Sequence, residues 1–235
     1  MNFIRSVQNL TKTEKILWLG SLAAVFLSAA LFPDPDWLSV ITSLVGATAL
    51  IFVAKGDPIG QLITLIFAVL YGVVSLFFRY YGEMLTYLCM TAPSALWALV
   101  TWLRNPYCAR QVKVARITTK KWLLLALGTA AATALMYFVL AVLNTPNLAV
   151  STLSVTTSFA ASLLTVFRSP YYALCYAAND IVLIILWILA TLSDIGYLPM
   201  VVCFLIFLIN DAYGFINWQR MKKSQEKSKA EKAFV

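Results

Sequence analysis

The chain has 235 residues, of which 61% are hydrophobic and only 12% carry a charge, and its mean hydropathy is +0.82. Soluble globular domains carry about a quarter charged residues, so this composition excludes a soluble protein and indicates an integral membrane protein. The formal net charge of +8 does not indicate a nucleic-acid partner, because the basic residues lie almost wholly in the connections between apolar stretches. The chain contains no histidine, which excludes imidazole ligands and histidine-based catalysis.

Apolar stretches long enough to cross a bilayer, about 20 residues each, fill most of the chain. They are continuous and lack the alternation of barrel strands, so they favour helices. We therefore predict an all-α integral membrane protein with about eight transmembrane helices. The predicted spans are Ile16–Phe32, Trp37–Ala54, Pro58–Phe78, Glu83–Leu103, Trp122–Leu143, Leu148–Phe167, Tyr171–Leu192 and Tyr197–Trp218.

The first of these stretches, Ile16–Phe32, has a second interpretation as a cleaved signal peptide, since Lys12 and Lys15 form a basic flank before it. Its apolar run is longer than the usual ~7–15 residues. Residues 33–36 are Pro-Asp-Pro-Asp, where a cleavage site would need small residues. We therefore predict a retained span.

The distribution of basic residues predicts the orientation of the chain in the membrane. With the N-terminus in the cytoplasm, the basic stretch 104–121, Lys55, Arg168 and the tail from Arg220 all lie inside, and only Arg79 lies outside. Both termini are thus predicted to be cytoplasmic. The four cysteines have no paired spacing and indicate neither a disulfide nor a metal site; they are Cys89, Cys108, Cys175 and Cys203.

Two groups of three helices correspond weakly but in order, one starting at Trp37 and the other near Leu148. In each group a basic residue and a proline separate the first two helices, as Lys55-Gly-Asp-Pro58 and Arg168-Ser-Pro170. Each third helix ends with tryptophan and arginine, which we interpret as membrane-interface residues, at Trp102 and Trp218.

A single span, Trp122–Leu143, separates the two groups and would make them parallel, with a substrate path between them. The predicted organisation is a 3+1+3 core preceded by one extra helix. Its segments are an N-terminal segment and extra helix (1–36), a first bundle (37–104), a basic loop and linker helix (105–147), a second bundle (148–220) and a basic tail (221–235).

Two Asn-Asp pairs in late spans are the strongest candidates for a site, because acids inside a membrane are rare and functional by default. Asp180 lies roughly 17 Å along its helix from Arg168, and Asp211 roughly 14 Å from Arg220, so the pairs share a depth. Tyr172 and Tyr176 recur on the face of Asn179 and Asp180, and aromatic rings beside an acid suit a flat cationic ring. The predicted substrate-binding residues are Gln61, Tyr71, Ser94, Trp97, Tyr172, Tyr176, Asn179, Asp180, Asn210, Asp211 and Tyr213.

Several polar side chains have an alternative structural interpretation. The serines at 151, 154, 158 and 162 form a stripe that favours close helix packing. Glu83 is interpreted as an interfacial residue near the outer surface. Asp211 either binds the substrate or neutralises a basic group at the inner end of the bundle.

Residues from about Trp37 to Arg220 resemble the PnuC family of vitamin transporters, which are related in fold to the SWEET sugar facilitators. The resemblance rests on the helix pattern, the basic-Pro helix openings and the segment Asn210-Asp-Ala-Tyr213, which is similar to that family's Asn-x-x-Tyr helix. Nicotinamide riboside carriers of the family usually show Trp-x-x-Trp-x-x-x-Asn, where this chain has Tyr172-Ala-Leu-Cys175-Tyr-Ala-Ala-Asn179. The asparagine is kept and both tryptophans are replaced.

The resemblance implies a facilitator in the inner membrane of a prokaryote that moves a vitamin-sized, nucleoside-like solute by alternating access, without cofactor or metal. Nicotinamide riboside is the first candidate for the solute, with thiamine, riboflavin and deoxynucleosides as alternatives. The resemblance also implies a homo-oligomer, a trimer. Proton coupling through Asp180 or Asp211 is an alternative mechanism. An intramembrane enzyme would need a clustered nucleophile and base, which the sequence does not provide, and a passive scaffold is the remaining alternative.

Overall fold

The structure, a computed structural model, describes residues 3–31, 37–77, 80–108, 111–145, 147–192, 195 and 198–231. Over these residues it is almost entirely helical. The helices are α1 (Phe3–Gln8), α2 (Lys12–Ala30), α3 (Trp37–Lys55), α4 (Ile59–Phe77), α5 (Tyr81–Leu85), the π-helix η1 (Thr86–Thr91), α6 (Ala92–Leu103), α7 (Thr119–Val142), α8 (Leu148–Val166), α9 (Tyr172–Thr191) and α10 (Leu198–Glu231). Two short antiparallel strands, β1 (Pro106–Cys108) and β2 (Gln111–Val112), connect α6 to α7.

Eight helices in the described part of the chain are long and apolar enough to cross a membrane, with α5, η1 and α6 forming one of them. This confirms the predicted all-α membrane fold. The predicted helix ends agree to within a few residues where they are described; Phe32, Phe78, Arg79 and Tyr197 lie outside the described residues. One boundary differs: the segment from 221, predicted as a separate tail, continues α10 as helix to Glu231.

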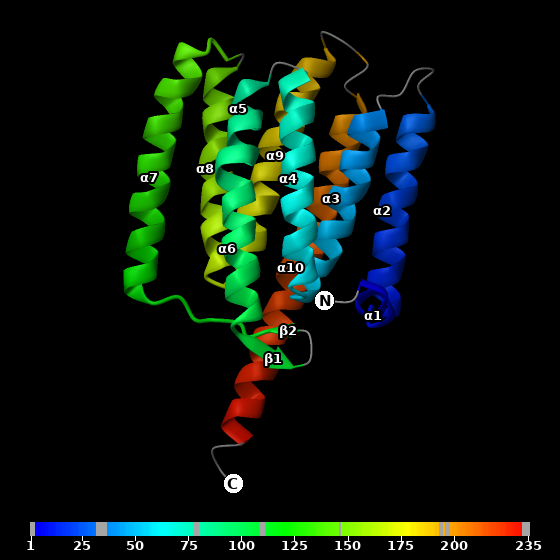
Figure 1. The fold of residues 1–235 in the computed structure, drawn as a ribbon, viewed down its shortest axis with the longest axis vertical. Coiled ribbons are helices and arrows are strands. Elements are labelled where there is room, and N and C mark those ends of the chain that lie inside the picture. The colour runs from blue at the N-terminus through cyan, green and yellow to red at the C-terminus, as the bar shows by residue number, and fades with distance from the viewer. Residues whose placement is uncertain are drawn as a thin grey trace.

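The helices stand side by side, with α2 at one edge of the bundle and α7 at the other (Figure 1). Only 22% of the α2 span and 11% of the α7 span are buried within the protein, against 61% of α3. The extra helix and the linker helix are thus peripheral. Helix α1, the two strands and the extended end of α10 gather at one end of the bundle, which we call the terminal end (Figure 1).

The helix connections of the two three-helix groups have the same backbone hydrogen bonds. In the first, the N–H groups of Gly56 and Asp57 donate to the carbonyls of Val53 and Phe52. In the second, the N–H groups of Arg168 and Ser169 donate to the carbonyls of Thr165 and Leu164. Each donor and each acceptor of the second connection lies 112 positions after its counterpart in the first. Residues 56 and 168 also share a left-handed backbone, with φ of 73° and 60°. These repeated details support the predicted duplication.

Trp102 and Trp218 tie each group to the other, and their interpretation as interfacial residues was wrong. Both side chains are fully buried. The Trp102 indole N–H donates to the Thr165 carbonyl at 3.0 Å, and the Trp218 indole N–H donates to the Val53 carbonyl at 2.9 Å. A large ring with one polar atom is well suited to this, because its N–H is satisfied while its apolar surface is removed from water and lipid. The third helix of each group is thereby fixed to the first helix of the other.

Candidate substrate site

A small cavity lies between the two three-helix groups, which we call the first unit (α3, α4 and α5–η1–α6) and the second unit (α8, α9 and α10). Its volume is about 50 Å³. Both units contribute side chains to its wall. The lining residues are Gly46, Ala49, Leu50, Val53, Gln61, Thr64, Phe67, Tyr87, Thr91, Thr165, Tyr172, Tyr176, Asn179, Asp180, Phe207 and Asp211.

Two carboxyl groups face this cavity from neighbouring helices, Asp180 from α9 and Asp211 from α10. Each residue is 4% exposed. The two carboxyls lie close enough to interact directly, and Asp180 Oδ2 has no hydrogen-bond partner among the described residues. They are the charged side chains of the lining set, and no lysine or arginine of that set balances them. The cavity is therefore electrostatically suited to a cation.

Asn179 lines the cavity, and its side-chain oxygen is already used in hydrogen bonds within the protein. Thr157 Oγ1 donates to Asn179 Oδ1 at 2.9 Å, and Ser154 Oγ lies 3.2 Å from the same oxygen. Ser154 Oγ also lies 3.2 Å from Glu83 Oε1, so its one proton serves either acceptor. With Oδ1 occupied, the Nδ2 donors of Asn179 are available to a solute carbonyl.

Tyrosine side chains from α9 form the wall beside the acids. Tyr172 is 1% exposed, and its hydroxyl has no hydrogen-bond partner among the described residues. The Tyr176 hydroxyl lies 3.2 Å from Ser162 Oγ, and the two tyrosine rings meet edge to face at 6.1 Å. Gln61, 2% exposed, lines the cavity from α4 and adds an amide to its polar groups.

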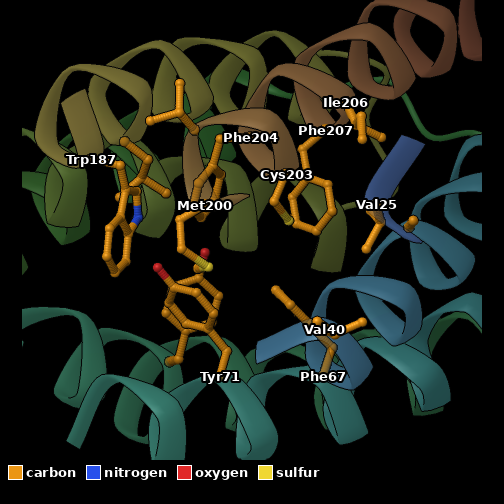
Figure 2. Close-up of a cluster of buried hydrophobic side chains, with 14 of the residues drawn as sticks. Val25, Val40, Phe67, Tyr71, Trp187, Met200, Cys203, Phe204, Ile206 and Phe207 are labelled. Carbon is orange, nitrogen blue, oxygen red and sulfur yellow. The ribbon is translucent and has the colours of Figure 1, made fainter. Parts of the chain in front are cut away.

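Aromatic layers close the cavity on two sides. Toward the end of the bundle away from the termini, Tyr71 packs on Tyr87 at 4.3 Å and on Phe204 at 6.0 Å. Figure 2 shows this outer aromatic layer, in which Tyr71, Trp187, Met200 and Phe204 lie together to the left of Phe67 and Phe207. Toward the terminal end, Trp218 packs on Tyr172 at 5.0 Å and on Trp102 at 5.3 Å. The structure is thus an occluded state.

The cavity volume supports the same description. Pockets for small molecules have volumes of about 300–1,000 Å³, several times that of this cavity. A vitamin-sized solute therefore requires the two units to move apart at least in part. The motion must separate side chains of one aromatic layer without disrupting the helices that carry them.

The structure brings together Gln61, Tyr172, Tyr176, Asn179, Asp180 and Asp211 around this cavity, as the sequence predicted. The other predicted residues lie outside it. Tyr71 is buried in the outer aromatic layer behind Tyr87. Ser94 and Trp97 lie on α6 away from the cavity, and Trp97 is 58% exposed on the outside of the bundle.

Asn210 and Tyr213 are directed toward α2 instead of the cavity. The Asn210 amide donates to Ser21 Oγ at 3.0 Å and to the Ile206 carbonyl at 2.9 Å. Tyr213 Oη donates to Glu14 Oε1 at 3.1 Å. Successive residues of a helix point about 100° apart, so Asp211 faces the cavity while Asn210 faces the extra helix.

Sequence reasoning missed the contribution of η1, whose Tyr87 and Thr91 line the cavity. A π-helical turn shifts the register of the side chains that follow it, and such turns are frequent at functional sites. It also missed Glu83, which was interpreted as interfacial. Glu83 is 2% exposed and contacts Ser154 beside Asn179. The segment carries no pattern that distinguishes a π-turn from regular helix, whereas an acid within the predicted span was itself a signal for Glu83.

Eight spans arranged around a small cavity between two similar units are typical of a membrane carrier. The sequence profile of the nicotinamide mononucleotide transporter family matches residues 36–220. The chain belongs to this family and is a multi-pass membrane transporter.

Individual relatives have similar lengths and names. The nicotinamide riboside transporter PnuC of Neisseria mucosa is 27% identical over 214 residues, covering 88% of this chain and 80% of the relative. The protein of the same name from Haemophilus influenzae is 25% identical over 215 residues, covering 90% and 92%. The crystal structure of the vitamin B3 transporter PnuC superimposes with a TM-score of 0.80 at 26% identity, covering 92% of this chain and 94% of that one.

Proposed function

We propose that the protein carries nicotinamide riboside across the inner membrane of a prokaryote by facilitated diffusion. The observation that carries this proposal is the cavity's combination of an acid pair, an amide donor and tyrosine rings. Two of the relatives bear the name of this solute. The chain is not proposed to be an enzyme, and no cofactor or metal enters the proposal.

Each part of nicotinamide riboside has a counterpart in the cavity. Its pyridinium ring is flat and positively charged, which suits the faces of Tyr172 and Tyr176 and the charge of Asp180. Its carboxamide oxygen is an acceptor for the free Nδ2 donors of Asn179. Its ribose hydroxyls pair with amide and hydroxyl groups such as Gln61 and Thr64, which line the cavity from α4.

The two units rock about this site in the proposed cycle. The layer of Trp102, Trp218 and Tyr172 opens toward the cytoplasm, and the outer aromatic layer opens toward the outside. Both termini are cytoplasmic in this proposal, as the distribution of basic residues predicts. A homotrimer is proposed as the assembly, in line with the family resemblance.

Thermal stabilisation of the purified protein tests the site. We expect nicotinamide riboside to raise the melting temperature more than thiamine, riboflavin or a deoxynucleoside does. Asn179→Ala and Asp180→Asn should each weaken the apparent affinity about tenfold or more, since loss of a buried hydrogen bond to a charged or polar solute group costs about 1.5–3 kcal/mol. Asn9→Ala, which changes an exposed asparagine, and Glu226→Gln, which changes an exposed acid, are the matched controls. Unchanged affinity in both cavity variants would show that the site is misplaced.

A further inference from the structure

Among the described residues, no lysine or arginine forms an ion pair with the acid pair of the cavity. Asp180 and Asp211 come from different helices, are almost fully buried and face the same small cavity next to each other. Two adjacent carboxylates cannot both remain ionised in a buried site of low dielectric constant, so one of them holds a proton when no cation is present.

The groups around the pair reinforce this requirement. The titratable side chains near it are Tyr87 from η1, Tyr172 and Tyr176 from α9 and Cys203 from α10. Glu83 of α5 lies further away, across Ser154 from Asn179. Each of these groups is neutral when protonated and negative when deprotonated, so none supplies a positive charge. The residues that α3, α4 and α8 contribute to the cavity wall are uncharged. The counter-charge must therefore come from a bound species.

Two unpartnered polar atoms point independently to that species. Asp180 Oδ2 and Tyr172 Oη are buried without a hydrogen-bond partner in the described structure, and both residues line the cavity. A buried polar atom without a partner costs about 1–3 kcal/mol, so these atoms are suited to a ligand. Tyr172 lies close enough to Asp211 for their charges to interact, which places the free hydroxyl beside the acid pair.

We propose that the Asp180–Asp211 pair holds one proton in the empty carrier and releases it when a cationic solute occupies the cavity. The inference rests on the proposed function and adds a proton that the same site releases when the solute binds. The solute's positive charge takes the place of the proton, and both carboxylates become ionised. The site therefore keeps the same net negative charge before and after the exchange. A solute of the same shape without a charge leaves the proton in place.

The exchange makes binding of the cation depend on pH. Because a proton leaves as the solute binds, protons compete with the solute, and affinity rises with pH. One released proton corresponds to about a tenfold change in affinity per pH unit where the empty site is protonated. Binding of an uncharged analogue does not change in this way.

Calorimetric titration of the full chain in detergent, in buffers of different ionisation enthalpy, counts the released protons. We expect about one proton per nicotinamide riboside bound and none for its uncharged 1,4-dihydro form, which keeps the size and carboxamide of the solute. This comparison uses the wild-type protein and does not depend on the folding of any variant. Asp180→Asn and Asp211→Asn should each abolish the release, and Glu226→Gln should retain it.

The outcomes separate this inference from the proposed function. Nicotinamide riboside binding without proton release would overturn the exchange and leave the solute assignment intact. Proton release in both Asp180→Asn and Asp211→Asn equal to that of the wild-type protein would also overturn the exchange, because another group would then supply the proton. Binding of thiamine with proton release, without binding of nicotinamide riboside, would support the exchange and overturn the solute. Absence of binding for both cations would overturn both.

Discussion

Glycine and arginine occupy equivalent positions in the two helix connections, although both backbones are left-handed. Gly56 adopts φ of 73° without steric cost, because it has no Cβ. Arg168 adopts φ of 60° with a Cβ, which costs about 1–2 kcal/mol for an ordinary residue. The first connection is also closely packed, since a Cβ at residue 56 would lie 2.6 Å from Met221 Cε.

A substitution at residue 56 tests this difference. Gly56→Ala should destabilise the protein by about 1–2 kcal/mol, because it adds left-handed strain and displaces the end of Met221. Arg168→Gly should change the stability by less than about 1 kcal/mol, because the strain that glycine removes is offset by the greater conformational freedom of glycine in the unfolded chain. The apparent melting temperature in detergent measures both. An equal fall in the two variants would contradict the account of this position.

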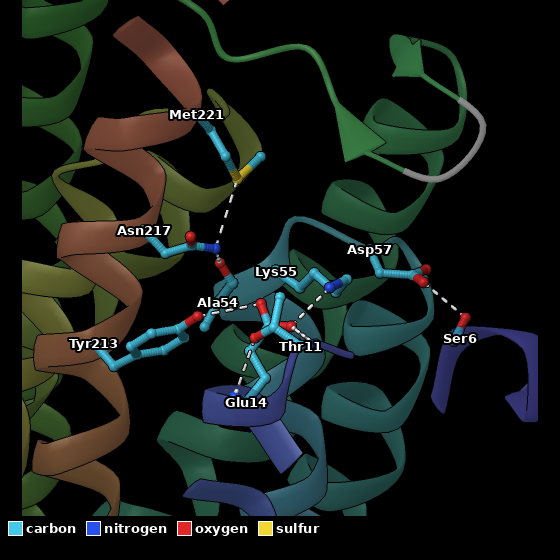
Figure 3. Close-up of polar contacts among 9 residues, drawn as sticks. All are labelled: Ser6, Thr11, Glu14, Ala54, Lys55, Asp57, Tyr213, Asn217 and Met221. Atoms are coloured by element: carbon cyan, nitrogen blue, oxygen red, sulfur yellow. Dashed lines mark hydrogen bonds and ion pairs between the residues drawn. The ribbon is translucent and has the colours of Figure 1, made fainter. Parts of the chain in front are cut away.

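At the scale of elements, the extra helix α2 is held to the core by a buried polar network around Glu14 (Figure 3). Glu14 caps its own helix with Thr11, each accepting a hydrogen bond from the other's backbone N–H. Its carboxylate also binds Lys55 Nζ of α3 at 2.7 Å and accepts from Tyr213 Oη of α10. One side chain thus joins three helices. The adjacent contact between Ser6 and Asp57 attaches α1 to the same region.

Removing Glu14 should therefore be costly. Glu14→Ala leaves Lys55 largely buried without its partner and removes the helix cap, so we expect a loss of about 3–5 kcal/mol. Glu226→Ala removes an exposed pair with Arg116 and should cost less than about 1 kcal/mol. Adding Lys55→Met to Glu14→Ala should restore part of the stability, because it removes the unpaired charge. Thermal unfolding in detergent compares the three variants, and the absence of any recovery would contradict the network described here.

The sequence predicted the helices well, but it predicted less well the direction in which individual side chains point. Continuous apolar runs define spans without ambiguity, because lipid allows few other structures. The direction in which a side chain points depends on its exact position along the helix. Asp211 points into the cavity, whereas its neighbour Asn210 points toward α2. The π-turn that carries Tyr87 into the cavity and the burial of Trp102 depend on tertiary packing, which local pattern does not specify.

At the scale of the whole molecule, transport requires the two aromatic layers to open in turn. Cys203 is a natural reporter for the outer aromatic layer, because its free thiol is 3% exposed beside Phe204 and Phe207. Phe204 packs on Tyr71 at 6.0 Å and on Phe207 at 5.5 Å. Opening of this layer should expose the thiol to a hydrophilic reagent.

Phe204→Ala should favour the open layer and raise the rate of Cys203 alkylation at least about tenfold, because loss of a buried phenylalanine costs about 3–5 kcal/mol in the closed state. The measurement uses a background in which the other three cysteines are serine. Phe77→Ala, which removes an exposed ring from the outside of the bundle, is the matched control and should leave the rate unchanged. An unchanged rate in Phe204→Ala would mean that this layer does not gate the cavity.

Uptake of labelled nicotinamide riboside into liposomes that contain the purified protein tests the central claim most directly. We predict saturable uptake that exceeds the uptake of empty liposomes and is inhibited by unlabelled nicotinamide riboside. Asn179→Ala and Asp180→Asn should each reduce this uptake about tenfold or more, and Asn9→Ala should leave it unchanged. Uptake equal to that of empty liposomes, or uptake that both cavity variants retain in full, would contradict the account.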